Sequence, residues 1–148
     1  GCQLVASCDL AYASNLAKFA TPGVNIGLFC STPMVAISRN LTNKHSMQML
    51  LTGELISSKK AAKIGLINDV VESTKLKDFV LDKAQKISKK SSVTLKIGKE
   101  AFYKQLDMKL SDAYDYASKV MVQNMLKLDA KEGIDAFIDK REPNWKDK

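Results

Sequence analysis

Few side chains in this sequence have the types and spacing that catalysis usually needs. The sole histidine, His45, follows Lys44 and precedes Ser46, with no carboxylate or nucleophile at a useful spacing. We therefore expect His45 on a surface or at a helix start rather than in a Ser–His pair. The sequence also contains no glycine pattern of the kind that cradles phosphates in Walker or dinucleotide sites.

The three cysteines indicate neither a disulfide framework nor a zinc site. Cys2, Cys8 and Cys30 are odd in number, lack a C-x-x-C spacing and have no accompanying histidines. We interpret them as buried thiols in a reducing compartment, and we expect no metal site.

The first four residues, Gly1-Cys2-Gln3-Leu4, could open a short helix. Free backbone N–H groups at such a start can stabilise an oxyanion. Small residues at a helix start also serve ordinary helix packing, and composition alone favours that second interpretation.

Basic residues outnumber acidic ones, with 23 Lys and Arg against 16 Asp and Glu, giving a formal charge of +7. This balance favours polyanionic partners such as nucleic acid, an anionic membrane or a ligand with several phosphates. The lysines are spread over amphipathic helices and aromatic residues are scarce. A nucleic-acid partner is therefore not expected.

The stretch from Phe19 to Ser38 carries no charged side chain and is long enough to cross a bilayer. It is interrupted by Pro22, Gly23 and Pro33, which do not suit a membrane helix. We expect no membrane span here. We expect instead irregular buried backbone that lines a pocket.

The first half of the chain mixes expected strands and helices, consistent with an α/β fold. Strands are predicted over Leu10 to Ala13 and Val24 to Phe29, and helices over Met34 to Leu41 and Lys44 to Leu51. Gly53 is expected to end the second helix.

A short helix is expected next, capped by Ser57 or Ser58 and ending at Gly65. A strand over Leu66 to Val71 follows it.

From Ser73 onward the pattern is helical. Helices are predicted from Leu76, over Val93 to Leu106, and from Ser111 onward, each with an apolar stripe. The third stripe is expected to bury Ala113, Ala117, Met121, Met125 and Leu128. Asp129 to Glu132 has the spacing of a capping box for a last helix.

Four segments, in order, resemble consecutive segments of the crotonase (enoyl-CoA hydratase/isomerase) superfamily. They are GCQLVASCDLAYAS, FATPGVNIGL, MLLTGELISSKKAAKIGLINDVV and EGIDAFIDKRE. The resemblance covers nearly the whole chain but begins in the middle of the family's domain. It implies the C-terminal portion of a spiral of ββα units over residues 1–72. An all-helical region over residues 73–148 would form trimers or dimers of trimers.

The resemblance also implies where catalytic groups would lie. Hydratases of the family have one glutamate in the helix after Gly1 and a second just after the proline of the F-x-x-P segment. These positions are occupied here by Gln3 and Gly23. Neither residue can move a proton near neutral pH, and general acid–base groups are typically worth about 100- to 10,000-fold each. Gly1 neighbours the expected oxyanion-hole donor, which would be the residue before it.

Other parts of the family's site are still represented. Phe137 and Lys140 match positions that contact the adenine nucleotide end of coenzyme A, and a lysine suits a phosphate. On residue types alone, the alternative is that Phe137 packs in the helical tail and Lys140 is solvated. For Lys140 the two interpretations are equally open. The loop expected to face the reaction centre contains Asn25, Leu28, Phe29, Cys30 and Ser31.

The sequence thus predicts a crotonase-family protein that binds an acyl-CoA thioester in fatty-acid metabolism, with no cofactor beyond coenzyme A. The chain most resembles a mitochondrial member, which implies a mitochondrial location, with any targeting segment outside these residues. Efficient hydratase activity is not expected, and whether the protein is an enzyme is left open. A non-catalytic acyl-CoA-binding or assembly protein is the alternative, and an RNA-binding homologue is the third.

Overall fold

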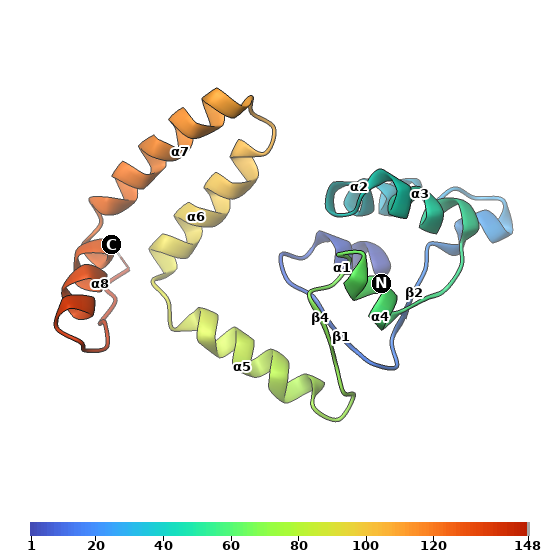
Figure 1. Ribbon diagram of the computed structural model, residues 1–148, viewed down its shortest axis with the longest axis horizontal. Helices are drawn as coiled ribbons and strands as arrows, with labels where there is room; N and C mark the ends of the chain where they lie inside the picture. The colour runs from blue at the N-terminus through green and yellow to red at the C-terminus, as the bar shows by residue number, and fades with distance from the viewer. Residues whose placement is uncertain (148) are drawn as a thin grey trace. The chain divides into compact units, whose positions relative to one another are not determined.

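The computed structural model describes residues 1–147, and the chain divides into two compact units, Gly1–Asp82 and Lys83–Lys148 (Figure 1). The first mixes helices and short strands, whereas the second is helical. Helix α5, Leu76–Ser88, crosses from the first unit into the second.

The first unit contains five helices and two small sheets. The helices are α1 (Cys2–Ser7), the 3-10 helix η1 (Pro22–Ile26), α2 (Ser31–Asn40), α3 (Asn43–Thr52) and α4 (Ser58–Lys63). The strands are β1 (Tyr12–Ser14), β2 (Lys18–Phe19), β3 (Ile56–Ser57) and β4 (Asp69–Val71). β1 pairs in parallel with β4, and β2 pairs antiparallel with β3. Parallel pairing requires a long crossover, which the intervening helices supply.

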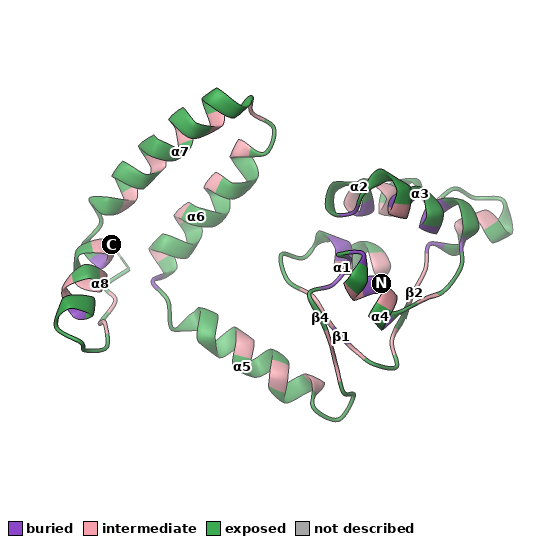
Figure 2. Cartoon of the chain, in the orientation of Figure 1, coloured by how far each residue is buried: buried purple, intermediate pink, exposed green. Residues whose placement is uncertain are grey.

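The core of the first unit lies between these helices and β1. Its buried side chains are Ala6, Ala13, Ile37, Leu41, Met49, Ala61, Ile64, Leu66 and Ile67. They come from α1, β1, α2, α3 and the segment around α4, so burial joins elements distant in sequence (Figure 2). The start of α5 adds an edge-to-face contact, with Phe79 5.2 Å from the Tyr12 ring.

Two predicted caps are confirmed. Gly53 ends α3 in the left-handed region with φ of 61°, and its N–H donates to Met49 O. The Ser57 hydroxyl accepts the Lys60 N–H at 3.2 Å and so starts α4. The helix-start role of His45 is also confirmed, because its backbone N–H donates to Thr42 Oγ1, the cap of α3.

The strand predicted over Val24 to Phe29 is wrong, because this segment begins with η1. Pro22 fixes φ at the first turn, and Gly27 closes the turn at φ of 78°. The Leu28 N–H then donates to Gly23 O at 2.9 Å, so the backbone pairs with itself rather than with a strand.

The other strands are shorter than expected. β1 begins at Tyr12 rather than Leu10. Leu66 and Ile67 are buried but precede β4 in a turn, where the Leu66 N–H donates to Ala61 O. Their hydrophobicity therefore reports burial rather than strand pairing.

The second unit consists of α6 (Ser92–Gln105), α7 (Leu110–Met125) and α8 (Leu128–Ile138), with the end of α5. α6 and α7 run side by side as a hairpin, and α8 packs against both (Figure 1). Among the described residues of this unit, the buried ones are Ser91, Asp129 and Ala136.

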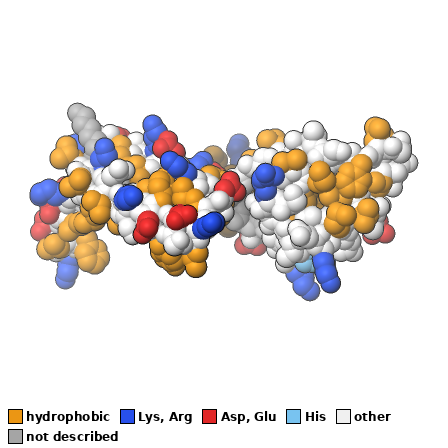
Figure 3. All heavy atoms as spheres, turned by 90° about the horizontal axis from the view of Figure 1, so that it is seen from above, with side chains coloured by type: hydrophobic (Ala, Val, Ile, Leu, Met, Phe, Trp, Pro, Cys, Tyr) orange, Lys and Arg blue, Asp and Glu red, His pale blue; other side chains and the backbone are white. Residues whose placement is uncertain are grey.

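The stripe predicted on α7 is mostly not buried. Met121 is 62% exposed, and Met125 and Leu128 are exposed as well. α7 contacts α6 and α8 only on part of its surface, which leaves these side chains open. Hydrophobic side chains are accordingly visible between the charged ones in Figure 3.

The cysteines are less buried than predicted. Cys8 is exposed just after the end of the short helix α1, while Cys2 and Cys30 are half-buried, and all three are free thiols. Within residues 1–147, none of the helices combines the length and the apolar character needed to cross a membrane.

Candidate functional site

The residues named from the sequence fall into two groups, one in each unit. Gly1, Gln3, Gly23 and the loop after Gly23 belong to the first unit, whereas Phe137 and Lys140 belong to the second.

Gln3 lies in the first turn of α1. Gly1 is the N-cap, and its carbonyl accepts the Val5 N–H at 3.1 Å. Gln3 is exposed, and its backbone carbonyl accepts the Ser7 hydroxyl at 2.9 Å. The Gln3 amide can donate and accept hydrogen bonds but does not titrate.

Gly23 is enclosed by the loop that follows it. A Cβ atom built on Gly23 would lie 2.5 Å from Leu28 O and 2.8 Å from Cys30 Sγ. The Gly23 N–H also points to Cys30 Sγ at 3.3 Å. Because one of these neighbours is backbone, a side chain at this position would require the loop to move.

Thr21 anchors this turn to α3, and nothing in the sequence pattern identified it. It is 2% exposed, and its Oγ1 donates to Met49 O at 2.9 Å. Asn25 lies against the end of the same helix, because a Cβ atom on Gly53 would be 3.1 Å from Asn25 Oδ1. The turn is therefore held at both ends by α3.

The rest of the loop is open. Asn25, Leu28, Phe29 and Ser31 are exposed, and Cys30 is half-buried. Burial raises the pKa of the Cys2 thiol, and the neighbouring Cys30 raises it further. Cys2 is thus a neutral thiol near the loop at pH 7, and no side chain there has the chemistry of a strong base.

In the second unit, Phe137 and Lys140 lie at the end of α8. Phe137 is 85% exposed, so the packing alternative left open by the sequence is wrong. Lys140 is exposed and has φ of 53°, in the left-handed region that favours glycine.

Two hydrogen bonds close this turn after α8. The Arg141 N–H donates to Ala136 O at 3.0 Å, and the Lys140 N–H donates to Phe137 O at 3.3 Å. This is the Schellman arrangement, in which the left-handed residue is usually glycine.

The predicted capping box at the start of α8 is wrong. Lys127 is the N-cap, and no side chain caps the helix there. Asp129 and Glu132 instead accept hydrogen bonds from residues 141–147, which follow the helix. Glu132 accepts from Arg141 Nη1 at 2.7 Å and from Arg141 Nη2 at 3.1 Å, and also accepts the Asn144 N–H at 2.7 Å.

These contacts lower the pKa of Glu132 from its usual 4.5 to about 2, the hydrogen bond from Arg141 being the largest cause. Asp129 is 1% exposed and accepts the backbone N–H groups of Lys146 and Asp147. Its pKa is also lowered, first by the hydrogen bond from Ser91.

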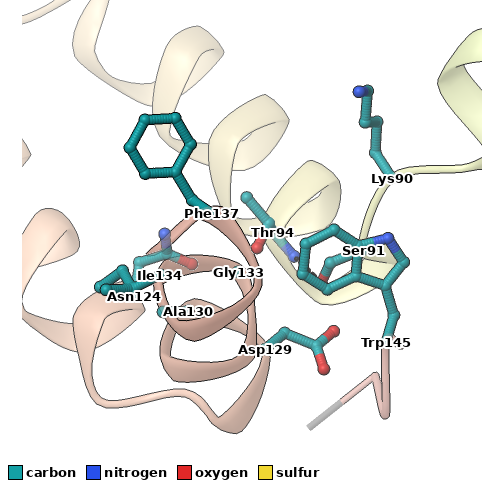
Figure 4. A pocket seen from close by; sticks show the side chains of 10 residues that line it. All are labelled: Lys90, Ser91, Thr94, Asn124, Asp129, Ala130, Gly133, Ile134, Phe137 and Trp145. Atoms are coloured by element: carbon teal, nitrogen blue, oxygen red, sulfur yellow. Dashed lines mark hydrogen bonds between the residues drawn. The ribbon is translucent and has the colours of Figure 1, made fainter. Parts of the chain in front are cut away.

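A cavity of about 460 Å³ lies between α8, the start of α6 and the C-terminal segment (Figure 4). Trp145 forms one wall, with its ring against Gly133 and its Nε1 donating to Lys89 O at 2.8 Å. Among the described residues, Asn124 Oδ1 is buried without a hydrogen-bond partner and lines the same cavity. The cavity thus combines mostly apolar walls with one unpaired acceptor.

Comparisons with known proteins agree with the family resemblance. The model of the enoyl-CoA hydratase/isomerase family matches residues 1–148. The enoyl-CoA hydratase domain-containing protein 3, mitochondrial, of Rattus norvegicus is 52% identical over 145 residues, which is 98% of this chain and 48% of that protein. The chain therefore spans about half the length of the curated relatives it matches.

Solved structures show the same fold. The crystal structure of human enoyl coenzyme A hydratase domain-containing protein 3 matches with a TM-score of 0.95 and 49% identity, over 97% of this chain and 57% of that one. An enoyl-CoA hydratase of Mycobacterium smegmatis matches with a TM-score of 0.95 and 46% identity, over 98% of this chain and 56% of that one. The predicted α/β fold of the crotonase type, with its helical region, is confirmed.

Proposed function

Because the chain belongs to the enoyl-CoA hydratase/isomerase family, we propose that it is part of a protein that binds an acyl-CoA thioester and is not an efficient hydratase. One observation carries the second half of this proposal. A Cβ atom at Gly23, where the resemblance aligns the second glutamate of a hydratase, would lie 2.5 Å from Leu28 O. The backbone is thus built around glycine, and Gln3 supplies no replacement acid or base.

The binding half of the proposal is supported by α8. Phe137 offers an exposed aromatic face and Lys140 an exposed ammonium group one turn later. These chemistries suit an adenine ring and a phosphate, respectively. The chain therefore has side chains suited to binding CoA, although it lacks the two acid–base glutamates.

Further parts of the proposal follow from the relatives. The mitochondrial name of the rat relative supports a mitochondrial location. A role in fatty-acid metabolism is proposed with it, on the family resemblance alone. The exposed apolar side chains of α7 and α8, among them Met121, Met125 and Leu128, support a contact surface between subunits. The proposed trimer or dimer of trimers rests on the family resemblance. Sedimentation of the natural full-length protein would test the oligomeric state.

The experiment is calorimetric titration of the full-length protein with acetyl-, crotonyl- and longer acyl-CoA and with free CoA. We expect binding that Lys140→Ala weakens about tenfold, as for the loss of one charge-assisted contact. Crotonyl-CoA hydration should stay near the uncatalysed rate. Rapid hydration, or failure of every CoA ligand to bind, would contradict the proposal.

A non-catalytic acyl-CoA-binding or assembly protein is the second candidate, and the enclosed Gly23 favours it. Turnover separates the two. A substrate-specific rate that disappears when Asn25 or Ser31 is altered would exclude the non-catalytic candidate.

A further inference from the structure

The turn that carries Lys140 is held by an ion pair that does not include Lys140 itself. Arg141 is the next residue, and its guanidinium donates two hydrogen bonds to Glu132, on the preceding turns of α8. Arg141 Nε also lies 3.5 Å from Asp139 Oδ2. The residues on either side of Lys140 are thus fixed together.

The same carboxylate extends its hold beyond the turn. Glu132 Oε1 also accepts the Asn144 N–H at 2.7 Å. Three hydrogen bonds therefore converge on one side chain, and two of them are of the bidentate kind that fixes direction as well as distance.

The hydrogen bonds of Glu132 can offset strain in the backbone at Lys140. A lysine in the left-handed region is strained relative to one in the right-handed region, and strained residues of this kind persist only where surrounding contacts enforce them. Without the pair, only the two backbone hydrogen bonds of the turn would oppose the return of Lys140 to the right-handed region. The direction in which its side chain leaves the helix end would then change.

We propose that Glu132 and Arg141 are positioning residues, which hold Lys140 in the left-handed turn and thereby present its ammonium group to a phosphate of the CoA nucleotide. This inference rests on the proposed acyl-CoA binding. It assigns Glu132 and Arg141 no contact with the ligand.

Glu132→Gln in the full-length protein is the central variant. Glutamine keeps the size of the side chain and can still accept the Asn144 N–H, but it loses the charge that Arg141 requires. We expect the Kd for acetyl-CoA to rise about tenfold, as for loss of the Lys140 contact. A short acetyl thioester without the nucleotide should bind both proteins equally.

A second measurement reports the turn directly. The coupling between the amide proton and the α-proton of Lys140, measured by NMR, depends on φ and should change in Glu132→Gln. Arg141→Lys, which keeps the charge but not the fork, should give an intermediate Kd. Asp135→Asn is the matched control, since it removes an ion pair with Lys131 on the same helix and should bind acetyl-CoA like the wild type.

The outcomes separate the two proposals. Wild-type binding that Glu132→Gln leaves unchanged would overturn the positioning role while the proposed function stands. An equal loss in Asp135→Asn would also overturn it, because any charge on α8 would then suffice. A wild type that binds no CoA ligand would overturn the proposed function, and the positioning role with it.

Discussion

The turns at Gly23 and at Lys140 treat a side chain in opposite ways. At Gly23 the space for a Cβ atom is already taken by Leu28 O and Cys30 Sγ. At Lys140 a long side chain is carried at φ of 53°, where glycine would be easier. One turn excludes a side chain, whereas the other keeps one despite the strain.

The first turn lies where a hydratase has a catalytic glutamate, and the second carries a proposed CoA-binding residue. The Gly23 turn cannot regain a carboxylate by substitution alone, because its own loop fills the space. The turn after α8 has a lysine at the left-handed position, where helices usually have glycine. The proposed loss of hydration and retention of CoA binding follow from these two backbones.

The largest expected effect is that of Gly23→Ala. The added Cβ atom meets backbone and sulfur at less than 3 Å, and overpacking of this kind typically costs 1–3 kcal/mol. We expect the free energy of unfolding to fall by about 2 kcal/mol, measured by urea denaturation. Gly23→Glu should destabilise at least as much and should not create hydratase activity, even together with Gln3→Glu.

Gln3→Glu alone is the matched control, because Gln3 is exposed and its side chain has room. It should unfold like the wild type. A Gly23→Glu variant that was as stable as the wild type and hydrated crotonyl-CoA would show that the loop does not exclude a side chain at position 23.

The main helices, two of the caps and the family could be predicted from the sequence because they depend on local patterns. Gly53 and Ser57 each act on backbone groups within a few residues, so spacing alone identified them. The Val24 to Phe29 segment failed because its apolar composition suits a strand, while Pro22 and Gly27 set the backbone angles.

The candidate site was harder to predict. Asp129 and Glu132 have the spacing of a capping box, but their partners after the helix are 9 to 18 residues further along the chain, and Ser91, the other partner of Asp129, precedes it by 38 residues. Local spacing contains no information on such partners. The same limit applies to Thr21, whose acceptor Met49 O is 28 residues away.

The second largest expected effect is a gain in stability when the strain at Lys140 is removed. Lys140→Gly should relieve the left-handed strain and raise the free energy of unfolding by about 1 kcal/mol, although the added freedom of the unfolded chain offsets part of it. The same variant should weaken acetyl-CoA binding about tenfold, as Lys140→Ala does. Denaturation and calorimetry on one preparation measure both.

Lys140→Ala is the control that separates the two roles of this residue. It removes the charge but keeps a Cβ atom, so binding should weaken without the gain in stability. If Lys140→Gly were no more stable than Lys140→Ala, the strain at this turn would not be real and the comparison with Gly23 would lose its second half.

The smallest expected effect is local and depends on pH. Glu132 has a pKa of about 2 in the folded chain against its usual 4.5, and Asp129 is shifted in the same direction. Because its pKa is lowered, ionised Glu132 stabilises the bound segment 144–147 fully above pH 4.5. This contribution is lost as the pH falls towards about 2. Trp145, the single tryptophan of the chain, should therefore change its fluorescence in this window.

Circular dichroism over the same titration distinguishes release of this segment from general acid unfolding, since α6 and α7 should persist while Trp145 moves into water. In Glu132→Gln the part of the transition that depends on this carboxylate should vanish, and Trp145 should already be more mobile at pH 7. A fluorescence change that begins above pH 5, or that coincides with the loss of helix, would mean that the two carboxylates do not hold the segment. The turn at Lys140 would then be held by the Arg141–Glu132 pair alone, with no contribution from the contact between Asn144 and Glu132.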